Sequence, residues 1–152
     1  MLCELAFAAL TSHAADWYER YREPMVEVCE DIAGRAEARG VPPRLAISLA
    51  WTESRWQDEV EGAVGERGPL QVTPRYHCDD VNDCDYIDAG LRSLGRYLAE
   101  HDVPTALCIY NTGRELAWCP YAGRVLGALE QVDAAETAAL DAGADADEGN
   151  EG

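Results

Sequence analysis

The sequence predicts a single, mainly α-helical domain with a small irregular β region, and three observations lead to this fold class. Apolar residues recur at helical spacing through most of the chain, as at Leu91, Leu94 and Leu98. The stretch from Gly62 to Pro74 is too rich in glycine and proline for a helix and predicts turns and short strands. A length of 152 residues suits one domain with a buried core.

The charge of the chain restricts its partners. The net charge is −17, and all 12 basic residues are arginines. Because this charge repels phosphate groups, we expect no nucleic-acid partner and no anionic membrane surface. An uncharged polysaccharide remains compatible with it. No segment is long and apolar enough to predict a membrane span.

Residues 1–15 leave two interpretations open. The run "LCELAFAAL" is apolar, and "TSHAAD" offers small residues for cleavage. However, Glu4 lies inside the run and no positive charge precedes it, which is unusual for a signal peptide. These residues are either a leader or a first helix, and the domain proper is expected over residues 16–132.

The next segments predict two helices separated by a sharp stop. Residues 17–39 carry apolar groups at helical spacing, and Gly40 ends this helix. Pro42 and Pro43 open the second helix, because proline is tolerated in a first turn. This second helix carries Glu53.

Two shorter helices follow the glycine-rich stretch and its acidic loop. Asp85 is a suitable N-cap for a helix over residues 86–100. Pro104 begins a short helix that runs to residue 111 and that Gly113 ends.

The end of the sequence predicts a change from structure to disorder. Residues 121–132 form a final predicted helix. From residue 133 the chain is alanine and acidic residues with almost no large apolar groups, so residues 133–152 are expected to be a disordered acidic tail.

Six cysteines favour local disulfides and therefore an oxidising compartment. Cys78 and Cys84 flank an acidic loop, and Cys108 and Cys119 flank "IYNTGRELAW". Neither spacing is typical of a zinc site. We expect a bridge within each of these two pairs.

Other states of the cysteines remain open at this point. Reduced core thiols are the alternative, above all for Cys29 and Cys108 on predicted helices. Cys3 is either removed with a leader or paired with Cys29.

Glu53 is a candidate general acid because of its neighbours. It is the only carboxylate between Arg44 and Gln57, and it shares one helical face with Leu45 and Leu49. Burial on that face would raise its pKa and keep the carboxyl protonated near neutral pH, as a glycosidase acid requires. The alternative is a structural glutamate paired with an arginine such as Arg55.

Four segments, taken in their order along the chain, suggest a role for this glutamate. They are "ESRW", "GERGPLQVTP", "ALCIYNTG" and "YAGRVL". In order and spacing they resemble the catalytic domain of the soluble lytic transglycosylases, in the goose-type lysozyme superfamily, over residues 41–129. The resemblance implies a lysozyme-like helical fold with a small irregular β region, peptidoglycan as substrate, and no metal or cofactor.

The resemblance also implies roles for individual residues. Glu53 matches the family's catalytic glutamate. The matching substrate-binding candidates are Ser54, Gly65, Gly68, Leu70, Gln71, Tyr110 and Asn111. The alternatives are a core position for Tyr110, a helix cap for Asn111, backbone hydrogen bonds for Gln71 and ordinary turns at the glycines.

The implied reaction is cleavage of the β-1,4 bond between N-acetylmuramic acid and N-acetylglucosamine. Glu53 alone would protonate the leaving oxygen and then remove the proton from the C6 hydroxyl, which leaves 1,6-anhydro ends. Gly62 stands where the family often has serine, and Glu66 adds a second carboxylate. Glu66 could support simple hydrolysis, although solvation or pairing with Arg67 is the simpler interpretation.

Three functions are therefore compared: a lytic transglycosylase, a muramidase-type hydrolase on the same fold, and a non-catalytic wall-binding module. The expected partner is the glycan strand of peptidoglycan, with no nucleic acid and no membrane span. We expect a monomer in the periplasm, in the cell wall or delivered by a virion. Secretion systems, conjugation machines and phage particles all use such enzymes.

Overall fold

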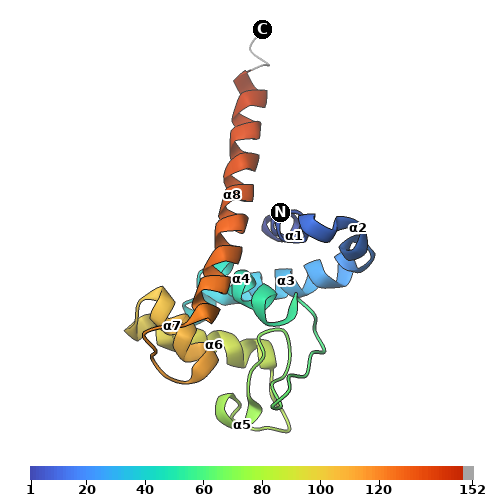
Figure 1. Cartoon of the computed structure of the whole chain (residues 1–152). Helices are drawn as coiled ribbons and strands as arrows, with labels where there is room; N and C mark the ends of the chain where they lie inside the picture. The colour runs from blue at the N-terminus through green and yellow to red at the C-terminus, as the bar shows by residue number, and fades with distance from the viewer. Residues whose placement is uncertain (149–152) are drawn as a thin grey trace.

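Helices make up most of the chain over residues 1–148, which the computed structural model describes (Figure 1). The α-helices are α1 (Leu2–Thr11), α2 (Ala15–Tyr18), α3 (Arg22–Ala36), α4 (Pro43–Ser54), α5 (Pro74–His77), α6 (Tyr86–Glu100), α7 (Val103–Thr112) and α8 (Pro120–Glu148). Short 3₁₀ turns lie at η1 (Ser12–Ala14), η2 (Glu19–Tyr21) and η3 (Glu37–Arg39). The prediction of a mainly α-helical fold is confirmed.

Helix α4 lies at the centre of the fold and packs against α3 and α8 (Figure 1). Ala46, Ile47, Leu49 and Ala50 on α4 are fully buried. A helix surrounded in this way normally carries only apolar side chains. Glu53 on its last turn is the single carboxylate of α4, and its partial burial calls for a physical reason.

The region between α4 and α5 contains no regular sheet within the described residues. Two isolated antiparallel bridges, Glu61–Arg67 and Arg67–Val72, replace the short strands that the sequence predicted. Leu70 and Val72 are buried and fasten this region to the core.

The predicted helix over residues 17–39 is interrupted. Helix α2 ends at Tyr18, the 3₁₀ turn η2 follows, and α3 begins only at Arg22. Pro24 explains the break, because a proline fits the first turn of a helix but not its interior. Gly40 ends the segment as predicted, in the left-handed conformation with φ of 74°.

Caps set the start of α6 and of α7. The Asp85 carboxylate accepts a hydrogen bond from the Asp88 N–H at 3.1 Å, which confirms the predicted cap. At α7 the cap is Asp102, which accepts from the Thr105 N–H at 2.9 Å, so the helix begins before Pro104. Gly113 ends α7 with φ of 79°.

Helix α8 is longer than the sequence predicted. Disorder was expected from residue 133, but α8 continues through Glu148, and residues 149–152 lie outside the described part. Alanine and glutamate are strong helix formers, so the helix continues although no large apolar side chains remain to pack against the core. Arg44 on α4 pairs with Glu136 at 2.7 Å and holds the turn after the last buried residue, Val132. The later turns of α8, in red, extend past the other helices (Figure 1).

Residues 2–11 form a helix that belongs to the core. The side chains of Ala6, Phe7 and Leu10 are buried, and α1 packs against α3 and α8. The Cys3–Cys29 disulfide joins α1 to α3. In this structure α1 is therefore part of the packed core. No helix within residues 1–148 has the length and apolar character needed to cross a bilayer.

The second predicted disulfide is wrong. Cys78 and Cys84 are bridged as expected, but Cys108 and Cys119 are free thiols. Cys108 is buried, with its Sγ 4.0 Å from the Thr112 hydroxyl, and Cys119 is partly exposed. Sequence spacing predicts that two cysteines lie close together, whereas a bridge also requires matching Cβ directions.

Alkylation should separate the two thiols from the bridged cysteines. In denaturant without reductant, iodoacetamide is expected to label Cys108 and Cys119 and to leave the other four of the six cysteines unmodified. Peptide mass spectrometry gives the positions, and a reduced sample with six labels is the control. An unlabelled Cys108–Cys119 peptide pair would show that these thiols are bridged in solution.

Candidate active site

Glu53 and Tyr121 form the centre of the candidate site. Glu53 lies on the last turn of α4, and Tyr121 lies on the first turn of α8. The Tyr121 hydroxyl donates a hydrogen bond to Oε1 of Glu53 at 2.6 Å. The packing of α4 against α8 therefore holds the carboxyl in one orientation.

Tyr121 was not among the residues assigned a role from the sequence. The signal was present, because Tyr121 is the first residue of "YAGRVL", one of the four segments that carry the family resemblance. Its spacing from Glu53 gives no hint of contact, since 68 residues separate them. Only the pairing of α4 with α8 brings them together.

The surroundings of Glu53 raise its pKa to about 7. Burial is the largest cause, because it disfavours the charged carboxylate. The hydrogen bond from Tyr121 and the charge of Arg124 lower the pKa, whereas the charge of Glu66 raises it. A carboxyl balanced in this way exchanges protons near neutral pH, which confirms the direction expected from its helical face.

Arg55 does not pair with Glu53, contrary to the structural alternative. Its guanidinium donates to the Trp51 carbonyl at 2.7 Å and lies over the Trp51 ring. Arg55 and Trp56 both adopt left-handed backbone conformations, with φ of 55° and 57°. This turn reverses the chain directly after the helix that carries Glu53.

Tyr110 connects α7 to the irregular region beside Glu53. It is buried, and its hydroxyl donates to the Leu70 carbonyl at 2.5 Å. Burial first, and then the nearby charge of Glu53, raise the pKa of Tyr110 well above its usual value. Tyr110 thus remains a hydrogen-bond donor and fixes the wall of the site, as the core alternative proposed.

Gln71 is held by the backbone of the irregular region. Its amide donates to the carbonyls of Val60 and Gly68, both at 3.0 Å. Gly65 and Gly68 have φ of +90° and +76°, which favour glycine. A Cβ at Gly68 would also lie 3.0 Å from Cβ of Tyr86. These residues shape the loop that faces Glu53, in agreement with the turn and backbone alternatives.

Glu66 occupies the space that Gly62 leaves. Its carboxylate accepts from the Val64 N–H at 3.1 Å, and a Cβ at Gly62 would lie only 2.1 Å from Oε2 of Glu66. The two departures from the family pattern are therefore coupled, because a larger residue at 62 would displace Glu66. Arg67 pairs with Glu61 at 3.1 Å and not with Glu66.

Of the remaining substrate-binding candidates, two have buried side chains and one is exposed. Ser54 is buried and donates its hydroxyl to the Ala50 carbonyl at 3.0 Å, and Leu70 is also buried. Both support the fold and are not placed to contact a substrate through their side chains. Asn111 is exposed and lines a hollow of about 260 Å³ together with Tyr121.

No group of three or more His, Cys, Asp or Glu side chains within residues 1–148 is arranged to hold a metal ion. No family model, curated protein or solved structure matches this chain.

Proposed function

We propose that this protein is a peptidoglycan lytic transglycosylase with Glu53 as its single general acid and base. The observation that carries the proposal is the largely buried Glu53 carboxyl, with a pKa of about 7, held by Tyr121. A group that first donates and then accepts a proton works best when its pKa lies near the working pH. The order of the four sequence segments supports a lysozyme-like fold and this substrate.

Glu53 carries both proton transfers of the proposed reaction. Glu53 protonates the glycosidic oxygen, and the bond to the anomeric carbon of N-acetylmuramic acid breaks. The sugar's own N-acetyl group eases the positive charge at that carbon. Glu53, now a carboxylate, takes the proton from the C6 hydroxyl, whose oxygen closes the 1,6-anhydro ring. The proton returns to Glu53, so no second carboxyl is required.

A muramidase-type hydrolysis is the second candidate, and Glu66 is the observation in its favour. The charge of Glu66 acts on Glu53, so a second carboxylate lies in the neighbourhood of the acid. In hydrolysis that carboxylate would assist water. Oε2 of Glu66 already accepts a hydrogen bond from the Val64 N–H, which favours a structural role for Glu66 in the loop.

The setting that suits this substrate is extracytoplasmic. The Cys3–Cys29 and Cys78–Cys84 disulfides are compatible with an oxidising compartment, where peptidoglycan also lies. The net charge of −17 is compatible with a neutral glycan backbone.

Product chemistry tests the proposal directly. Purified peptidoglycan digested with the protein is expected to yield muropeptides with anhydro ends, which mass spectrometry identifies as lighter by one water than reducing ends. Reducing ends alone would replace the transglycosylase by the hydrolase. Binding without any released muropeptide would leave only the wall-binding module.

Tyr121→Phe should change the pH dependence of cleavage. The Tyr121 hydrogen bond lowers the pKa of Glu53, so its removal is expected to raise that pKa and move the alkaline limb of the rate profile to higher pH. The rate at the optimum should also fall, because the carboxyl loses the partner that orients it. Rates measured from pH 4 to 9 on both proteins give the result. An unchanged limb would show that Tyr121 does not act on the titrating group.

A further inference from the structure

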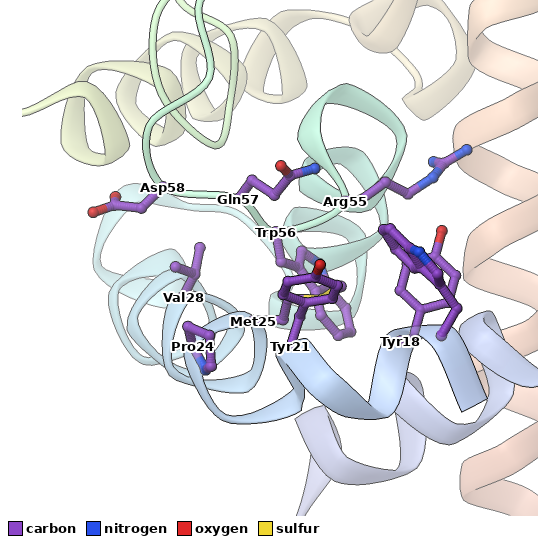
Figure 2. Close-up of a pocket in the computed structure, with 10 residues that line it drawn as sticks. Tyr18, Tyr21, Pro24, Met25, Val28, Arg55, Trp56, Gln57 and Asp58 are labelled. Carbon is purple, nitrogen blue, oxygen red and sulfur yellow. The ribbon is translucent and has the colours of Figure 1, made fainter. Parts of the chain in front are cut away.

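A second hollow lies beside residues 55–58, which directly follow α4 (Figure 2). Its volume is about 490 Å³, and it opens between α2–α3 and residues 55–58. Met25 and Trp56 are buried and form its floor. Trp17 and Tyr21 form its wall and remain 55% and 46% exposed, which is high for large aromatic side chains.

The aromatic side chains at this hollow form a connected and ordered series. The ring of Trp17 lies 5.0 Å from that of Tyr21 and 4.8 Å from that of Tyr18. Tyr18 contacts Trp51 at 5.6 Å, and Trp51 contacts Trp56 at 5.2 Å. Because each ring is held by the next, the exposed faces are fixed before any ligand arrives, which lowers the entropy cost of binding.

The rim of the hollow is polar and electrically balanced. Arg55, Gln57 and Asp58 extend from the chain above it and supply donors and acceptors (Figure 2). One cation and one anion offset each other, so the rim does not select a charged ligand. Apolar faces combined with a polar rim suit a pyranose ring, whose C–H faces are apolar and whose edges carry hydroxyl and amide groups.

The hollow also shares lining residues with its neighbours. Arg55 lines it and a neighbouring hollow of about 300 Å³, which Arg124 also lines. Arg124 in turn lines the hollow of Asn111 and Tyr121. The aromatic hollow is thus linked through two shared arginines to a hollow that Tyr121, the partner of Glu53, lines.

We propose that this aromatic hollow binds a sugar ring of an uncharged, N-acetylated β-1,4-linked oligosaccharide. Its role as a distal subsite for the glycan strand rests on the proposed function, whereas saccharide binding itself does not. A second copy of the chain is a poorer occupant, because two chains of charge −17 repel each other.

Calorimetric titration with the β-1,4-linked hexamer of N-acetylglucosamine tests the proposal. The titration uses the full chain with Glu53→Gln, so that the hexamer stays intact. Adding Trp17→Ala is expected to weaken binding by about tenfold or more, as for a stacked aromatic anchor, and Tyr21→Ala should act in the same direction. Leu140→Ala, at a 70% exposed position on α8, is the matched control and should leave the affinity unchanged.

Circular dichroism verifies that each variant is folded, which the exposure of Trp17 favours. Unchanged affinity in both aromatic variants, or no binding of the hexamer at all, overturns the inference. Sedimentation velocity tests whether a second copy of the chain occupies the hollow. A dimer that Trp17→Ala converts to a monomer would show that this face is a contact between copies and would overturn the inference. Peptidoglycan cleavage is scored separately, so either proposal can fail while the other stands.

Discussion

Glu53→Gln is expected to reduce the release of muropeptides by about 10²- to 10⁴-fold, the usual effect of losing a positioned proton donor. Glutamine keeps the shape of the side chain and can still meet the hydroxyl of Tyr121, but it cannot transfer a proton. The release rate from purified peptidoglycan, measured by chromatography at a pH near the optimum, gives the size of the effect.

Glu66→Gln is the matched control for this prediction. It removes the second nearby carboxylate, and the amide oxygen can still accept from the Val64 N–H. Its effect on the rate should be far smaller. If Glu66→Gln is the inactive variant, or if Glu53→Gln cleaves at a near-normal rate, another group is the catalytic acid.

Glu53→Gln should also stabilise the fold, and by an amount that depends on pH. The pKa of Glu53 is about 7 in the folded chain against an ordinary value of 4.5. The folded state therefore holds this proton more tightly, and the wild type loses stability as the pH rises from about 4.5 to about 7, by about 3 kcal/mol at most. Glutamine has no such loss. The melting temperatures of the two proteins should be similar at pH 4 and should separate towards pH 8 in favour of the variant.

Gly95→Ala is expected to destabilise the protein by about 2 kcal/mol or more, within or above the usual range for overpacking. A Cβ at this position of α6 would lie 1.8 Å from the Arg39 carbonyl oxygen. The obstacle is backbone, so α6 or η3 must move, and the salt bridge between Arg39 and Asp88 at 2.7 Å would be strained with them. Urea unfolding at neutral pH measures the loss.

Gly34→Ala is the control that separates crowding from helix propensity. Gly34 lies on the exposed side of α3, and nothing would lie within 4 Å of its added Cβ. Alanine is a better helix former than glycine, so this variant should gain about 0.5–1 kcal/mol. A gain at Gly95 as well would mean that α6 is not pressed against η3 in solution.

Local signals predicted those elements whose ends depend on local chemistry. The cap at Asp85, the apolar spacing that follows and the left-handed glycines at 40 and 113 gave the bounds of several helices. The interruption before Arg22 could have been read from Pro24. The extension of α8 was missed because disorder was inferred from the lack of apolar groups, although alanine alone favours a helix.

The features of the candidate site also divide into those that local sequence predicts and those that it does not. The face of α4 predicted the burial of Glu53 and the direction of its pKa, because both follow from helical spacing. The hydroxyl of Tyr121, the free state of Cys108 and the place of Glu66 beside Gly62 depend on how distant segments meet. No local pattern contains that information.

The position of α8 has a consequence for how the chain is made. Helix α4, with Glu53, leaves the ribosome well before α8, yet α4 and α1 both pack against α8. Until the residues of α8 emerge, Glu53 lacks its tyrosine and the core lacks one side. Contacts between such distant segments form late in folding. In a nascent chain, Glu53 therefore has no orienting hydroxyl until synthesis has passed Tyr121 and the turns that follow.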